Sequence, residues 1–255
     1  MKHSLLCLRM DDVGASSKQF EVYSNTRWAN VGPLKSFDKY KAWGRYDELT
    51  AETWEEIFCL LVKKSARLEI GITASWVDQH GACIPFPEMF PEQAALISDA
   101  VSDGLISVSN HGYSHCVVGK HRPRLFTSNR KWHREFWDWL PREIHQDHLE
   151  KSQSIFGDWL GFRPTNFIPP GNVYAAKTVS LLKEFGIETV NSSTKPCPDE
   201  FFSANRVRYV DCASVVAFHD REISMYGVRW MSQLIEKKRA EYEFCFIKDL
   251  CVSGD

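Results

Sequence analysis

The 255-residue chain lacks several features that would assign it to a simple class of protein. It has no apolar run near the roughly 20 residues that a membrane-spanning helix needs, and no low-complexity segment or internal repeat. Its 31 Lys and Arg residues are balanced by 33 Asp and Glu residues. The composition therefore gives no support to nucleic-acid binding, which usually requires a strongly basic domain. A hydrophobic share of 44% excludes a disordered chain.

The cysteines and the first residues indicate the compartment. The eight cysteines include no Cys-x-x-Cys pair, so their spacing excludes a zinc ribbon. The apolar stretch at residues 5–8 is shorter than the roughly 7–15-residue core of a secretory signal. We therefore expect reduced thiols and a cytoplasmic protein.

Short apolar segments alternate with segments of helical spacing along the whole chain. Because each crossover helix returns the chain to the same end of the sheet, this alternation predicts parallel pairing and favours a barrel, with a doubly wound open sheet as the alternative. A helix over 53–65 begins with a capping box of Thr53 and Glu56. We expect strands over 4–10, 68–77, 105–109, 165–168, 187–191, 207–212, 214–218 and 244–247, and the other helices over 91–103, 141–160, 175–185 and 227–242.

Polar residues follow three of the predicted strands, where catalytic groups gather in parallel α/β folds. Asp11 and Asp12 end the first strand, and a bound cation would offset their mutual repulsion. His111 and His115 follow the strand at 105–109 with a glycine between them that permits a turn. His219 ends the apolar strand at 214–218, where an imidazole that titrates near neutral pH suits acid–base chemistry.

These residues together predict a metal-activated hydrolase. Two imidazoles and one carboxylate would supply three ligands and leave a coordination position open, as in catalytic zinc sites. The other carboxylate is then available as a base. A competing pair, His145 and His148, is predicted to lie on the solvated face of a helix. Taken singly, each of the three segments also fits a plain structural role.

The order of these motifs resembles the polysaccharide deacetylase family, also described as NodB homology or carbohydrate esterase family 4-like. The likeness consists of Asp-Asp-x-Gly at 11–14, His-x-x-x-His at 111–115, Pro-Pro-Gly at 169–171 and the His-Asp strand end at 219–220. It runs from about Ser4 to Leu250. It implies one domain over 1–255, folded as a distorted (β/α) barrel of about seven parallel strands. It also implies metal-dependent hydrolysis of an N-acyl group, acetyl or formyl, from a sugar.

The resemblance also implies the roles of individual residues. Asp12, His111 and His115 would hold one divalent metal, with Zn²⁺ expected and Co²⁺, Ni²⁺ or Mn²⁺ as alternatives. Asp11 would be the base and His219 the acid that protonates the leaving amine. A backbone N–H near Gly112 or Tyr113 would stabilise the oxyanion. The residues expected to bind substrate are Tyr113, Pro170, Gly171, Arg163 and Trp132.

The sequence departs from the family at two places. Ile168 stands where the family has the arginine that tethers the base, so Arg163 or Arg9 would have to replace it. The family's Asp-Trp element, which helps to set the acid histidine, is not recognisable around 190–198, and Asp220 is the candidate substitute.

Two segments, at about 19–47 and 117–142, are expected to be insertions specific to this chain. The second is rich in Lys, Arg and aromatic residues, which fits an acidic, nucleotide-linked or lipid-linked sugar, for instance in lipopolysaccharide O-antigen biosynthesis. A solvated basic loop is the plainer alternative. The other functional readings are a metal-dependent hydrolase of a non-sugar amide and a non-catalytic sugar-binding relative.

Overall fold

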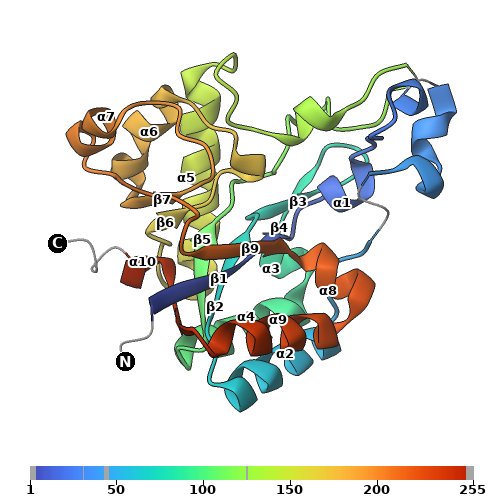
Figure 1. Cartoon of the computed structure of the whole chain (residues 1–255). Coiled ribbons are helices and arrows are strands. Elements are labelled where there is room, and N and C mark those ends of the chain that lie inside the picture. The colour runs from blue at the N-terminus through green and yellow to red at the C-terminus, as the bar shows by residue number, and fades with distance from the viewer. Residues whose placement is uncertain (1–3, 31, 43–45, 125, 251–255) are drawn as a thin grey trace.

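The computed structural model describes residues 4–30, 32–42, 46–124 and 126–250. One parallel sheet curls into a half-barrel (Figure 1), which confirms the predicted distorted barrel rather than a doubly wound open sheet. Seven strands lie next to one another across the sheet, and an eighth, β9, pairs with β1. The strand order is β10 (Tyr242–Cys245), β1 (Ser4–Val13), β2 (Leu68–Ile72), β5 (Ile106–Asn110), β6 (Asn166–Phe167), β7 (Thr189–Asn191) and β8 (Arg208–Val210), with β9 at Val215–His219.

The helices form two groups with separate apolar cores. Helices α2 (Ala51–Lys64), α4 (Pro91–Ser102) and α9 (Val228–Arg239) lie together in Figure 1 and bury their apolar faces in one cluster with β1, β2 and β5. Helices α6 (Ala176–Leu182) and α7 (Asp199–Ala204) bury theirs in a second cluster with β6 and β7. Helix α5 (Arg142–Leu160) contributes to both clusters, with Phe156 in the first and Leu149 in the second. The short helices are α1 (Ser17–Phe20), α3 (Phe86–Met89), α8 (Asp220–Tyr226) and α10 (Ile247–Leu250). No helix of the described residues has both the length and the apolar character to cross a membrane.

Three local predictions need correction. Helix α2 begins at Ala51, because Thr50 and not Thr53 is its N-cap: the Thr50 hydroxyl accepts from the Thr53 N–H at 3.3 Å. The strand predicted over 68–77 is two strands: β2 ends at Ile72 in the main sheet, and β3 (Ser75–Val77) pairs antiparallel with β4 (Cys83–Pro85) in a separate sheet. Helix α8, which starts directly after β9, was not predicted.

Strand β1 separates two environments because its side chains alternate between opposite faces. Leu6, Leu8 and Met10 pack in the cluster of α2, α4 and α9. Cys7 lies in a third cluster with Ile168 inside the curl of the sheet. Arg9 and Asp11 lie on the same face of β1 as Cys7, because every second residue of a strand faces the same side. Two charged side chains therefore lie on the inner side of the barrel.

The two predicted insertions lie side by side at one corner of the molecule (Figure 1). Buried Asn129 joins them: its Oδ1 accepts from the Val22 N–H at 2.8 Å, and its Nδ2 donates to the Phe20 carbonyl at 2.7 Å. The Lys35 ammonium donates to the carbonyls of Arg124 and Thr127. The second insertion is therefore not merely a solvated loop, because buried polar contacts hold it against the first.

Truncation of Ile57 to Ala tests the core under β1. Ile57 is fully buried on α2, so we expect the change to lower the free energy of unfolding by about 2–5 kcal/mol. Val62→Ala on the same helix is the matched control, because Val62 is 67% exposed, and its effect should stay within about 0.5 kcal/mol. Urea denaturation measures both. Equal effects of the two changes would contradict the packing described for α2.

Candidate metal and catalytic site

The end of β1 turns two consecutive carboxylates toward one pocket. Asp12 has a φ of 69°, which is unusual for a residue with a side chain, and the pairing of β1 with β2 shifts register between Met10 and Val13. An irregularity of this kind re-aims a side chain that would otherwise face the opposite side of the sheet. Asp11 and Asp12 consequently line the same pocket.

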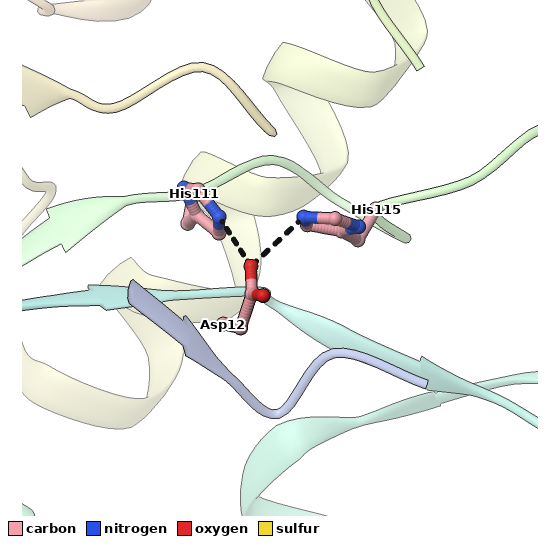
Figure 2. A group of neighbouring side chains, drawn as sticks. All are labelled: Asp12, His111 and His115. Carbon is pink, nitrogen blue, oxygen red and sulfur yellow. Dashed lines mark hydrogen bonds and ion pairs between the residues drawn. The ribbon is translucent and has the colours of Figure 1, made fainter. Parts of the chain in front are cut away.

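Two histidines reach the pocket from the segment that follows β5. His111 and His115 are buried, and the Nε2 atom of each lies 3.1 Å from Asp12 Oδ1. Figure 2 shows both imidazoles directed at that carboxylate. The turn between them depends on Gly112, which has a φ of 88°. A Cβ atom added at this glycine would lie only 1.9 Å from Glu135 Oε1. Any larger residue at 112 would collide with Glu135.

Asp12, His111 and His115 fit a divalent metal. Their ligand atoms all lie within 4.8 Å of one another, and the 3.1 Å separations are close to the roughly 3.3 Å between donors around tetrahedral zinc. His111 Nδ1 lies 2.7 Å from the Ile168 carbonyl, which can only accept, so Nδ1 carries the proton and Nε2 presents its lone pair. Burial lowers the pKa of His115, which favours the neutral imidazole that a metal requires.

Arg9 holds Asp11 in place. Its Nη2 donates to Asp11 Oδ2 at 2.7 Å, and its Nη1 donates to the side chain of Asn191 on β7. Asp11 Oδ1 is buried without a hydrogen-bond partner among the described residues. Arg9 thus makes the contact expected of the family arginine that Ile168 replaces. Arg163 is exposed in a separate hollow beside the beginning of β5 and β6, and the structure does not bring it to this pocket.

His219 faces Asp11 through strand pairing, because the two residues are direct neighbours in the parallel register of β1 and β9. Its Nδ1 lies 3.6 Å from Glu222 Oε2, and the same carboxylate accepts from the His219 backbone N–H at 2.8 Å. Burial acts to lower the pKa of His219, but the carboxylates of Glu222, Asp12 and Asp11 outweigh it and raise that pKa to about 9. His219 is therefore protonated at neutral pH, the state that an acid needs.

Asp220, expected to help set His219, instead pairs with a lysine. The fully buried Lys18 ammonium donates to Asp220 and, at 2.5 Å, to Glu48. Burial raises the pKa of Asp220 to about 7 although Lys18 opposes this. This ion-pair cluster fixes the start of α8 directly after His219 and ties it to Lys18 and Glu48, which flank the first insertion.

A buried carboxylate, to which no motif of the sequence points, supports the histidine turn. Glu135 Oε1 accepts from the His115 N–H at 2.9 Å, and its oxygens accept from the N–H and hydroxyl of Ser114. His148 Nδ1 pairs with the same carboxylate. The prediction of a solvated His145 and His148 is therefore wrong, because both are buried and His145 Nδ1 meets the Thr178 hydroxyl at 2.8 Å.

Of the residues expected to bind substrate, only Gly171 lines the pocket with the metal and catalytic candidates. Tyr113 packs its ring on His148, Pro170 is buried beside Gly112, and Trp132 packs against Trp139. The Gly112 N–H is engaged by the Asn110 side chain at 2.8 Å, so it is committed to the turn rather than to an oxyanion. Tyr46, an aromatic residue of the first insertion, also lines the pocket, as we expect of that segment. Lining residues that the sequence did not single out for the pocket are Ser17, Lys18, Glu21, Arg134, Asn172 and Arg221.

Comparison with solved structures places the fold. The chain is similar to the Xyl-CE4 domain of a multidomain xylanase from the hindgut metagenome of Trinervitermes trinervoides, with TM-score 0.53, 11% identity, and coverage of 98% of this chain and 90% of that one. It is also similar to a family 4 acetyl xylan esterase from Clostridium thermocellum in complex with a cobalt ion, with TM-score 0.52, 12% identity, and coverage of 97% and 90%. At these identities the likeness establishes the fold alone.

The same fold occurs in a protein described as a pseudoenzyme. BA3943 from Bacillus anthracis, described as a CE4 family pseudoenzyme, matches with TM-score 0.52 and 12% identity over 98% of this chain and 65% of that one. No curated protein matches the chain. A family model described as polysaccharide deacetylase matches residues 35–190, which is more than half of the chain. This match confirms the resemblance to the family, and the chain belongs to the polysaccharide deacetylase family.

Proposed function

We propose that the protein is a metal-dependent hydrolase that removes an N-acyl group, acetyl or formyl, from an amino sugar or a precursor that contains one. One observation carries the proposal: side chains from three strand ends, Asp11 and Asp12, His111 and His115, and His219, line a single pocket. These are the groups that amide hydrolysis needs, namely a metal site, a base and an acid.

The chain's own residues divide the work as follows. A divalent ion held by Asp12, His111 and His115, in our proposal Zn²⁺, supplies Lewis-acid chemistry when bound: it polarises the acyl carbonyl and makes water more acidic. Asp11, oriented by Arg9, takes the proton from the attacking water. His219 gives a proton to the amine nitrogen as the bond to the acyl carbon breaks, because an unprotonated amine leaves poorly.

The Arg9 contact favours an enzyme over a non-catalytic relative. The loss of the family arginine at Ile168 would leave the base untethered, but Arg9 restores a 2.7 Å ion pair to Asp11 from the same strand. We propose further that the substrate is a nucleotide-linked or lipid-linked sugar of surface-polysaccharide biosynthesis. The basic second insertion beside the pocket supports this proposal, since cationic side chains bind phosphate and carboxylate groups.

Metal stoichiometry tests the ligand set directly. After loading with zinc and removal of excess metal, we expect about one zinc per chain in the wild type and none in His111→Ala/His115→Ala, because two of the three ligands are lost. Elemental analysis measures the content without reference to activity. His80→Ala, on the exposed surface, is the control and should retain its zinc. A wild-type chain that holds no metal would overturn the assignment.

The adjacent carboxylates should behave differently when each is changed to the amide. Asp11→Asn should keep its zinc and release acetate or formate from amino-sugar substrates at least about 100-fold more slowly, because the base is lost. Asp12→Asn should lose both zinc and activity. The measurements are elemental analysis and acid release from a panel of N-acetyl and N-formyl amino sugars. A fully active Asp11→Asn would refute the proposed base, and a zinc-loaded wild type inactive on the whole panel would contradict the deacylase.

The pH dependence of the rate tests His219 as the acid. Its pKa is raised to about 9, so the active protonated form is present below that pH and is lost as the pH rises through about 9. We expect Glu222→Gln to shift this high-pH decline toward neutrality, because the neutral amide removes one of the negative charges that hold the proton. Profiles of kcat/KM against pH measure the shift. An unchanged decline in Glu222→Gln would argue that His219 is not the group titrating there.

A further inference from the structure

A second hollow of about 420 Å³ adjoins the catalytic pocket on the side of the second insertion. Arg134 and Gly171 line both spaces, so one ligand can extend from one into the other. Arg130, Lys131 and Trp137 also line the second hollow. The mechanism above uses none of these three side chains.

The hollow carries net positive charge. Arg130, Lys131 and Arg134 line it, and Glu21 lies within ion-pair distance of Arg130 and Arg134. Glu21 lies 3.8 Å from Arg130 Nε and 3.6 Å from Arg134 Nη1, and both separations exceed hydrogen-bond length. Three cationic side chains and no carboxylate thus line the hollow among the described residues, in a chain whose overall formal charge is −2.

Buried polar contacts fix the wall that presents these cations. The turn Arg130–His133 lies between Asn129 and Arg134, and Asn129 and His133 are at most 1% exposed. Asn129 is bonded to the first insertion, and His133 Nε2 lies 2.9 Å from the His121 carbonyl. Trp137 Nε1 donates to the Lys131 carbonyl at 2.7 Å, which holds that ring in place. The hollow is therefore formed before any ligand arrives, which lowers the entropic cost of binding.

We propose that this hollow binds an anionic group, a phosphate or a carboxylate, on the sugar whose N-acyl group occupies the catalytic pocket. Guanidinium and ammonium groups make charge-assisted hydrogen bonds to such oxygens, and the flat face of Trp137 offers apolar contact to the ring that carries them. The inference rests on the proposed function, because one substrate must reach both spaces. A neutral polymer would bring no negative charge to these three cations, so the reaction that supplies the substrate is one that forms a sugar phosphate or a sugar acid.

Binding of small charged sugars tests the inference without turnover. The zinc-loaded chain is titrated with glucose 1-phosphate, glucuronate and glucose by isothermal titration calorimetry. We expect at least one charged sugar to bind about 10-fold or more tightly than glucose, and Arg130→Ala/Lys131→Ala to remove about that advantage, as charge-assisted hydrogen bonds are lost. The zinc content of this variant should equal that of the wild type. Any contact between phosphate and the metal is then the same in both proteins, so a loss of affinity in the variant is due to the hollow.

The control is Lys237→Ala/Arg239→Ala, which removes two exposed positive charges from α9 and should leave the affinities unchanged. Tight binding of glucose 1-phosphate alone identifies a phosphate, and tight binding of glucuronate alone identifies a carboxylate. Equal affinity for all three sugars, or an equal loss in the control, overturns the inference. A chain that binds the charged sugar through Arg130 and Lys131 but releases no acyl group keeps the anion site and loses the proposed function.

Discussion

The pocket depends on the change of direction that β1 makes at Asp12. A regular strand would send Asp11 and Asp12 to opposite faces, one into the barrel and the other into the apolar cluster under the helices. The positive φ of Asp12 and the local shift of register bring both carboxylates to the same pocket. The two negatively charged carboxylates repel each other. Two sets of contacts offset this repulsion: Arg9 pairs with Asp11, and the imidazoles of His111 and His115 face Asp12.

The parallel pairing of β1 then assembles the rest of the chemistry. Its pairing with β9 places His219 beside Asp11, so the proposed acid and base are neighbours although more than 200 residues separate them in the chain. Buried charged groups hold both the histidine turn and the segment that follows His219 in place. The histidine turn is held by Glu135, and the start of α8 is held by the Lys18 cluster. Buried ionic groups of this kind contribute little net stability but strongly penalise any arrangement that separates them, so they favour a single geometry.

The two predicted insertions border the pocket. They meet through buried Asn129 and the carbonyl contacts of Lys35, and together they form a wall beside the carboxyl ends of the strands. Glu21 of the first insertion and Arg134 of the second both line the catalytic pocket. Loops of this kind modify what a rigid scaffold binds without disturbing its core. In our proposal, the ligand is therefore selected by segments that contribute no metal ligand.

The sequence by itself determined the alternation of strands and helices, and with it the parallel half-barrel, because hydrophobic periodicity is a local property that each segment carries. It also predicted that Asp11, Asp12, His111, His115 and His219 lie close together, since they end or follow strands of one parallel sheet, and they do line one pocket. It could not show that Arg9 and not Arg163 meets Asp11, because that choice depends on which face of β1 turns inward. The burial of His148 against Glu135, and the joining of the two insertions, were decided by the tertiary structure alone, since contacts between distant segments leave no period in the chain.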